Sequence, residues 1–175
     1  TLIKSVILIS AFLVMLCSLN YVKQNDILKI EYPILILSSI LGMLVMVSSN
    51  DLIVFYVGLE LQSLALYVLA AFKRDNILSS ESGLKYFILS ALSSGLLLYG
   101  CSLIYGFSSS TNFDLIYQNS ESIEYGIIFG IVFVLVGLAF KITAVPFHMW
   151  APDVYDGSPT SCLLYTSPSP RDAHK

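Results

Sequence analysis

The fold class is decided by residues 52–72, LIVFYVGLELQSLALYVLAAF. The strongly polar side chains in this stretch are those of Glu60, Gln62 and Ser63. As an α-helix rising about 1.5 Å per residue, it is long enough to cross about 30 Å of hydrocarbon. We therefore predict a membrane-spanning helix with one carboxylate, Glu60, near its middle.

The composition of the whole chain extends this prediction. Of its 175 residues, 56% are hydrophobic and 12% are charged, and the mean hydropathy is +0.79. These values exclude a water-soluble globular domain and favour an all-α integral membrane protein in contact with lipids. The charged residues are dispersed, with a formal net charge of -3, so no basic tract predicts a nucleic-acid partner.

The apolar stretches predict about five transmembrane helices, each long enough to span a bilayer. Strands of a β-barrel would instead be shorter and would alternate in polarity. We place all five in one transmembrane helical fragment, residues 1–160, with spans at about 5–22, 32–49, 52–72, 82–107 and 125–146.

Two of these spans carry charges of opposite sign, Glu60 and Lys141. Such a charge costs about 2.5 to 3.5 kcal/mol at the centre of a membrane helix, so it is kept for a task or a partner. The helical rise places the two residues at levels about 10 Å apart, which permits contact through a water or polar group and leaves direct pairing open. Lys85 enters its span at about the level of Lys141, and we expect a line from Lys85 through Lys141 to Glu60.

The chemistry of such a line suits proton transfer. Burial favours the neutral forms of lysine and glutamate, whereas a nearby opposite charge favours the ionised forms. Pro146 has no amide hydrogen, so we predict a broken helix near Pro146, where the carbonyl of Ile142 loses its helical partner. Broken helices with an ionisable residue are typical of ion-transporting membrane proteins. His148 is a candidate relay beyond the break.

Each of these residues also has a structural interpretation. Glu60 is explained by a hydrogen-bonded carboxyl inside a helix bundle, and Lys85 by an ordinary helix pair with Glu81. Lys141 is explained by a side chain that extends towards the membrane interface. His148 is explained by an interfacial position beside Trp150.

The sequence predicts no metal or cofactor bound by this chain. Cys17, Cys101 and Cys162 stand singly, without the paired spacing of a zinc or iron–sulfur site. A Gly-x-Gly-x-x-Gly dinucleotide turn is also missing from the sequence.

Three motifs carry a family resemblance: 58–64 (GLELQSL), 83–86 (GLKY) with 93–95 (SSG), and 140–159 (FKITAVPFHMWAPDVYDGSP). Over about Glu31 to Thr160, the chain resembles the antiporter-like membrane-arm subunits of NADH:ubiquinone oxidoreductase (respiratory complex I), in particular subunit 2, the bacterial N subunit. The resemblance implies helices 3 to 7 of an inverted-repeat fold with a broken helix 7. It also implies that Glu60, Lys85 and Lys141 match the glutamate and lysines that translocate protons in that family.

The resemblance implies further expectations about cofactors and partners. NADH, FMN, iron–sulfur clusters and ubiquinone would be bound by other subunits, and the partners would be other membrane-arm subunits. The quoted motifs are closest to plant and protist versions, which favours the mitochondrial inner membrane; the bacterial plasma membrane is the alternative. Because the chain opens with Thr1 and lacks helices of the family, we expect a partial chain whose polar residues 161–175 are a non-family tail of artefactual origin.

These expectations give one leading function and two alternatives. The leading one is a proton-translocating subunit that couples electron transfer from NADH to quinone, in other subunits, to proton pumping through buried Glu and Lys residues. The first alternative is a subunit of a multisubunit sodium/proton antiporter. The second is a non-catalytic membrane scaffold in which the charges only hold helices together.

Overall fold

The computed structural model describes residues 2–24, 31–72, 76–118 and 125–158. Within these ranges every named element is a helix, and the β-pairing found there is an isolated bridge between Asp51 and Asn112. The predicted all-α fold class is confirmed.

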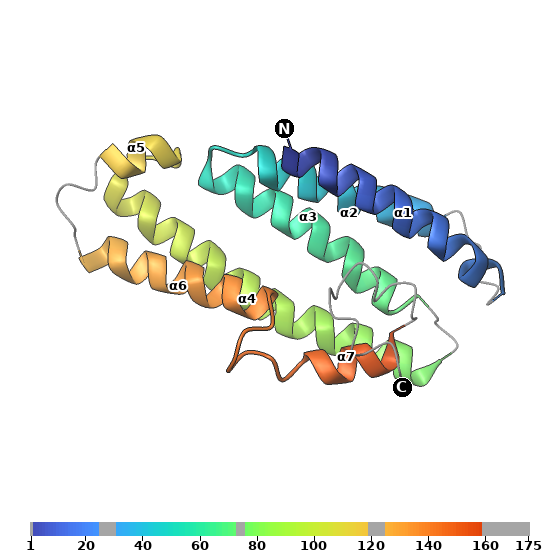
Figure 1. The fold of residues 1–175 in the computed structure, drawn as a ribbon. Coiled ribbons are helices and arrows are strands. Elements are labelled where there is room, and N and C mark those ends of the chain that lie inside the picture. Colours follow the sequence, from blue (N-terminus) through green and yellow to red (C-terminus); the bar gives the residue numbers. More distant parts are fainter. Residues whose placement is uncertain (1, 25–30, 73–75, 119–124, 159–175) are drawn as a thin grey trace.

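Each predicted span corresponds to one helix of the structure, and two short helices, α5 and α7, were not predicted (Figure 1). Among the described helices, α2, α3 and α4 are long and apolar enough to cross a membrane. Two further apolar helical stretches, Leu2–Cys17 of α1 and Tyr125–Lys141, are shorter. The helices are α1 (Leu2–Gln24), α2 (Glu31–Ser48), α3 (Leu52–Ala70), α4 (Ile77–Ser108), α5 (Phe113–Gln118), α6 (Tyr125–Lys141) and α7 (Ala151–Gly157).

The helices form two groups that meet between α3 and α4. Helices α1 to α3 lie together, α6 lies along one part of α4, and α7 lies along the other (Figure 1). Residues 161–175 lie outside the described ranges, so the division into a helical fragment and a tail stays a prediction.

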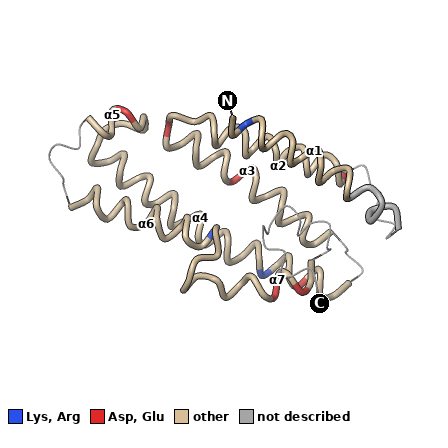
Figure 2. The backbone as a smooth tube through the Cα atoms, in the orientation of Figure 1, with Lys and Arg blue, Asp and Glu red and all other residues tan. Residues whose placement is uncertain are grey.

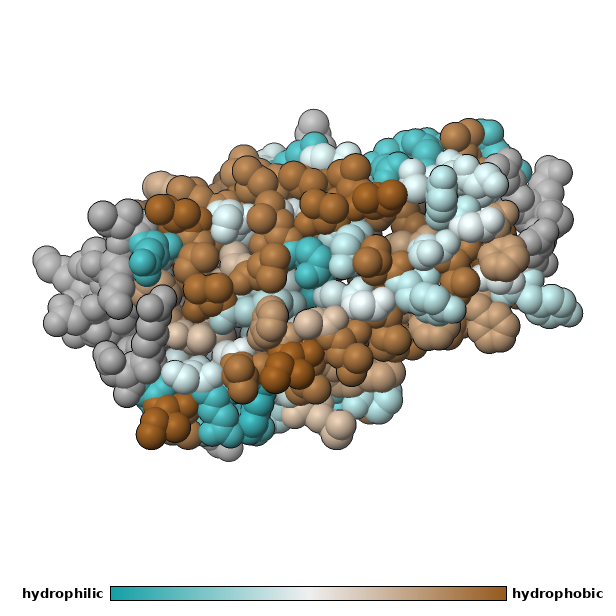
Figure 3. Space-filling model, turned by 180° about the vertical axis from the view of Figure 1, so that it is seen from behind, coloured by the Kyte–Doolittle hydropathy of each residue, from teal (hydrophilic) through white to brown (hydrophobic). Residues whose placement is uncertain are grey.

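The surface of this bundle suits hydrocarbon. Large apolar side chains project outward along the helices, and Phe12, Leu92 and Phe129 are 64%, 65% and 61% exposed. Apolar side chains form large brown areas on the face seen in Figure 3, with a hydrophilic group near its middle, and few charged residues interrupt the middle of the bundle in Figure 2. In water such large exposed apolar areas would drive aggregation, whereas lipid tails accommodate them.

Glycines bring two pairs of helices into backbone contact. A Cβ atom on Gly42 of α2 would lie 2.6 Å from the amide nitrogen of Gln62, and one on Gly58 would lie 2.7 Å from that of Met46. In the second pair, a Cβ on Gly100 of α4 would lie 2.7 Å from the carbonyl oxygen of Gly130 on α6. Small residues of this kind let membrane helices pack closely, and here they fix α3 against α2 and α6 against α4.

The helix is broken near Pro146 as predicted, but α6 ends before the proline rather than at it. The helix ends at Lys141, five positions before Pro146. Thr143 adopts a left-handed conformation with φ of 56°. The amides of Thr143 and Ala144 then donate to the carbonyls of Phe140 (3.2 Å) and Ala139 (2.8 Å). This is the Schellman pattern, which normally uses glycine at the left-handed position, so a backbone reversal rather than the missing proline amide ends the helix.

The carbonyl of Ile142 accordingly belongs to the segment beyond the helix, and it accepts a hydrogen bond of 2.7 Å from the hydroxyl of Thr143. As a result of the early ending, Lys141 occupies the last helical position of α6. The negative end of the helix dipole favours a cation there.

Candidate functional site

The candidate site is built on one stripe of α3. Glu60, Ser63 and Tyr67 follow the spacing i, i+3 and i+7, which places their side chains one above another on the same face of the helix. Ser63 and Tyr67 are buried, at 6% and 5% exposure. The stripe therefore presents a carboxylate and two hydroxyls to the neighbouring helices.

Lys141 extends from the end of α6 to this stripe. Its ammonium nitrogen lies 3.4 Å from Oε1 of Glu60, 3.0 Å from Oγ of Ser63 and 2.8 Å from the phenol oxygen of Tyr67. An ammonium group has three N–H donors, and these three contacts match that number. The nitrogen also lies 5.5 Å from the centre of the Tyr67 ring.

Helix α4 completes the site with Ser94. The buried hydroxyl of Ser94 donates to the same carboxylate oxygen, Oε1 of Glu60, that faces Lys141. It also lies 3.0 Å from the backbone carbonyl oxygen of Ser90. Three helices that are separate in the sequence, α3, α4 and α6, thus contribute to one hydrogen-bonded group.

Burial makes this group energetically important. The side chains of Lys141 and Glu60 are 12% and 21% exposed. Removing one partner of a buried ion pair costs about 3–5 kcal/mol, because the other charge is left uncompensated. The pair therefore stabilises the contact between α3 and the end of α6.

Helical spacing left open whether Glu60 and Lys141 pair directly, and the structure shows that they do. A level difference of about 10 Å is obtained when both helices stand upright and their side chains are ignored. In the structure the long lysine side chain closes that difference, and Nζ of Lys141 reaches the carboxylate without an intervening group. Glu60 and Lys141 are the two predicted site residues that the structure brings together.

Lys85 does not share the contacts of this pair, and its place in the expected line stays a prediction. Its side chain is 43% exposed and forms ion pairs of 2.9 Å with Glu81 and with Asp153 of α7. Lys85 lies nine positions before Ser94 on α4, and at about 3.6 residues per turn this places the two on opposite faces of the helix. The helix pair with Glu81 that the structural interpretation of Lys85 expects is present, and a role of Lys85 in proton transfer stays a prediction.

His148 lies in the segment between α6 and α7, and its side chain is exposed. Its backbone carbonyl accepts a hydrogen bond of 3.1 Å from the amide of Ala151. The hydrogen bonds of Lys141 go to side chains of α3, and His148 takes no part in them. A relay function of His148 stays a prediction.

Three site residues, Ser63, Tyr67 and Ser94, were not predicted from the sequence. Ser63 and Ser94 lie inside the family motifs at 58–64 and 93–95, and Tyr67 follows one turn after Ser63. The detectable signal was the recurrence of hydroxyl residues at helical spacing from Glu60. What the sequence could not provide was the face of α4 that turns towards α3.

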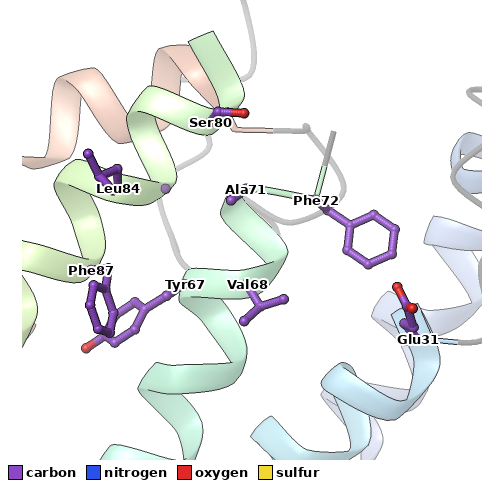
Figure 4. Close-up of a pocket in the computed structure, with 9 residues that line it drawn as sticks. Glu31, Tyr67, Val68, Ala71, Phe72, Ser80, Leu84 and Phe87 are labelled. Carbon is purple, nitrogen blue, oxygen red and sulfur yellow. The ribbon is translucent and has the colours of Figure 1, made fainter. Parts of the chain in front are cut away.

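A cleft of about 400 Å³ opens beside the site, between α2, α3 and α4. Figure 4 shows Tyr67 and Phe87 at one end and Phe72 and Glu31 at the other. Tyr67 contributes its ring to this cleft and its hydroxyl to Lys141. Across the described ranges, no group of three or more His, Cys, Asp or Glu residues is arranged to hold a metal ion.

Comparison with known proteins identifies the family. The sequence profile of the family described as NADH:quinone oxidoreductase/Mrp antiporter, TM, matches residues 49–166, which include every residue of the site. The chain belongs to this family. Its match covers more than half of the chain and contains α3, α4 and α6.

Among its relatives is NADH-quinone oxidoreductase subunit N of Pelagibacter ubique, which is 66% identical over 170 residues. That alignment covers 97% of this chain and 36% of the relative, so the chain spans about a third of the relative's length. This relative is bacterial, and it gives no support to the expected mitochondrial inner membrane.

The chain is also similar to solved structures of more than one kind of membrane complex. One is respiratory complex I from Thermus thermophilus with bound aureothin, with a TM-score of 0.70 and 37% identity over 79% of this chain and 31% of that chain. Another is the Mrp complex from Dietzia sp. DQ12-45-1b, with a TM-score of 0.68 and 28% identity over 77% of this chain and 26% of that chain. Both agree with an all-α membrane fold.

Proposed function

We propose that this chain is part of a proton-translocating membrane-arm subunit of NADH:quinone oxidoreductase. The observation that carries the proposal is the direct contact between Glu60 and Lys141, two oppositely charged groups on the apolar helices α3 and α6. A proton that leaves Lys141 removes the positive charge that stabilises ionised Glu60, so the protonation of each group depends on the other. Such coupling is what a pump requires of its buried charges.

The family supports the rest of the proposal. The 66% identity to a subunit named NADH-quinone oxidoreductase subunit N favours complex I over other assemblies. By this resemblance the chain assembles with other membrane-arm subunits in lipid, and NADH, FMN, iron–sulfur clusters and quinone are bound by other subunits. The proposed location is the plasma membrane of a bacterium. Proton transfer within this chain then responds to electron transfer elsewhere in the complex.

The test is the Glu60→Gln variant in the full-length subunit of the assembled complex. We expect proton pumping per NADH oxidised to fall at least severalfold, because glutamine keeps the size of the side chain and removes its charge. Glu31→Gln is the matched control, since Glu31 is exposed at the beginning of α2. Pumping with unchanged rate and stoichiometry in Glu60→Gln, at normal assembly, would remove this residue from the mechanism.

A sodium/proton antiporter subunit is the second candidate, supported by the similarity to the Dietzia Mrp complex. The two candidates differ in what co-purifies with the chain. Quinone-linked NADH oxidation in the purified assembly supports complex I. Sodium-dependent proton exchange without any dehydrogenase activity supports the antiporter.

A membrane scaffold is the third candidate. In a scaffold the charges of Glu60 and Lys141 would only hold α3 against α6. Neutralising both residues together would then harm assembly no more than neutralising either one, and transport per assembled complex would stay intact. Loss of transport in a fully assembled double variant excludes the scaffold.

A further inference from the structure

The hydrogen-bonding capacity of the site exceeds what a fixed ion pair needs. We propose that Ser63, Tyr67 and Ser94 are positioning residues that keep Glu60 and Lys141 hydrogen-bonded in both of their protonation states. This inference rests on the proposed function, in which both groups gain and lose protons. It concerns side chains that touch the pair and act through it.

The contacts of Lys141 show why hydroxyl partners matter. As an ammonium group, Lys141 donates to Glu60, Ser63 and Tyr67. After losing a proton it becomes an amine with two N–H groups and one lone pair, and that lone pair needs a donor. Ionised Glu60 can only accept hydrogen bonds, whereas a hydroxyl donates or accepts according to the rotation of its hydrogen.

Tyr67 meets this requirement without moving its ring. The ring is held by edge contacts to Tyr86 and Phe87, with centroids 4.7 Å and 5.8 Å away. Its hydroxyl, 2.8 Å from Nζ of Lys141, can turn its hydrogen towards the nitrogen when the nitrogen becomes an acceptor. Ser63 has the same freedom, because it now accepts from Lys141 at 3.0 Å and donates to the carbonyl of Leu59 at 2.7 Å.

Ser94 does the same for the carboxyl group. Its hydroxyl has one hydrogen and two acceptors within reach, Oε1 of Glu60 and the carbonyl of Ser90. When Glu60 is ionised, that hydrogen is donated to the carboxylate. When Glu60 is protonated, its O–H donates to Ser94, and the serine hydrogen turns to the Ser90 carbonyl.

The two arrangements differ by one proton transfer. An N–H bond of Lys141 breaks and leaves its electron pair on nitrogen, and an O–H bond forms from a lone pair of the Glu60 carboxylate. A positive and a negative group become a neutral amine and a neutral acid. Because a buried polar group without a partner is costly, a site with fixed donors and acceptors would oppose one of the two arrangements.

Other titratable groups near the pair are few in the described part of the chain. Tyr56 lies one turn before Glu60 on α3, and Tyr86 and Cys101 face this region from α4. Glu31 lies across the cleft on α2, and α6 contributes only Lys141 near the site. The charge of Lys85 is compensated by Glu81 and Asp153.

The test compares Ser94→Ala, Ser94→Thr and Tyr67→Phe in the full-length subunit of the assembled complex. The measured quantity is the rate of NADH-driven proton pumping per assembled complex, determined at a series of pH values to give a pH profile. Ser94→Ala should lower the rate about tenfold, as expected for losing a hydrogen bond to a charged group, and should move the acidic limb of the profile to higher pH. Tyr67→Phe should move the alkaline limb to lower pH, because the ammonium group loses an acceptor.

Two controls distinguish a positioning role of these hydroxyl groups from a purely structural role. Ser94→Thr restores the hydroxyl and should restore both the rate and the profile. Tyr99→Phe also removes a phenol hydroxyl from the same helix as Ser94, but Tyr99 is 53% exposed and contacts Phe133, so its profile should match the wild type.

The inference is overturned if Ser94→Ala and Tyr67→Phe retain the wild-type rate and profile, or if they reduce only the amount of assembled complex. Glu60→Gln is measured in the same assay. The proposed function and the positioning role can therefore fail separately. If Glu60→Gln loses pumping but Ser94→Ala and Tyr67→Phe keep the wild-type pH profile, only the positioning role is contradicted. If Glu60→Gln pumps normally, the proposed function itself is contradicted.

Discussion

At the scale of single residues, two of the described carboxylates have different roles. Glu60 and Lys141 meet inside the bundle, whereas Asp51 caps the beginning of α3. The carboxylate of Asp51 accepts from the amides of Ile53 and Val54 at 2.8 Å and 3.4 Å. It also accepts from the hydroxyl of Thr111 at 2.5 Å, which ties the beginning of α3 to the segment after α4.

These hydrogen bonds make stability depend on pH. The bond from Thr111, supported by the two amides, lowers the pKa of Asp51 below its usual value. A depressed pKa in the folded chain stabilises the fold above the pKa of the unfolded chain, about 3.9, and this contribution is lost as the pH falls further. We expect the midpoint temperature of thermal unfolding in detergent to decrease when the pH is lowered below about 4. In Asp51→Asn the midpoint temperature should decrease less steeply over the same pH range.

Thr111→Val provides the matched variant, because valine keeps the shape of threonine and removes the hydroxyl donor. It should also weaken the dependence on pH. Thermal unfolding monitored by circular dichroism at a series of pH values between about 2 and 7 measures the acid sensitivity of both variants. Identical acid sensitivity in wild type, Asp51→Asn and Thr111→Val would show that other carboxylates control it.

At the scale of helices, α4 crosses closely over α6, the helix that ends at Lys141. A Cβ added at Gly100 meets backbone atoms of α6, the Gly130 carbonyl oxygen at 2.7 Å and the Val134 amide nitrogen at 2.8 Å. Backbone cannot rotate away as a flexible side chain can, so the helices would have to separate. Gly95, on the same helix, has open space around the position of a Cβ.

We therefore expect opposite results from two glycine substitutions in α4. Gly100→Ala should destabilise the chain by about 1–3 kcal/mol through overpacking. Gly95→Ala should be neutral or stabilise by up to about 1 kcal/mol, because alanine favours the helix. Denaturant unfolding in detergent measures both, and equal stabilities of the two variants would contradict the tight crossing.

At the scale of the whole molecule, Trp150 connects the segment after α6 to α4. Its ring stacks on Tyr86 with centroids 4.6 Å apart and on Phe140 with centroids 5.9 Å apart. Its indole nitrogen donates to the carbonyl of Phe140 at 3.3 Å, and the residue is 6% exposed. Together with the Lys85–Asp153 ion pair, it holds α7 against α4.

Trp150→Ala should cost about 3–5 kcal/mol of unfolding free energy, because a large buried aromatic ring is removed. The neighbouring Met149 is 83% exposed, and Met149→Ala should change stability by less than about 0.5 kcal/mol. Denaturant unfolding of both variants in detergent provides the comparison. A loss below about 1 kcal/mol in Trp150→Ala would show that α7 docks without it.

The sequence by itself determined the class of the protein and its two central charges. The length of an apolar run and a charge within it are local properties, because the bilayer fixes both the length needed to cross it and the cost of the charge. Glu60 and Lys141 were therefore identified before any contact was known. The motifs around them also indicated the family.

Only the tertiary structure decided how those charges are paired. The rotation of α4 about its axis turns Ser94 towards Glu60 and Lys85 away from it, and that rotation depends on packing between helices distant in sequence. The left-handed Thr143 ends α6 at Lys141, a conformation that threonine seldom adopts and no local pattern predicts. Contacts between helices, and not the spacing within one helix, assembled the site.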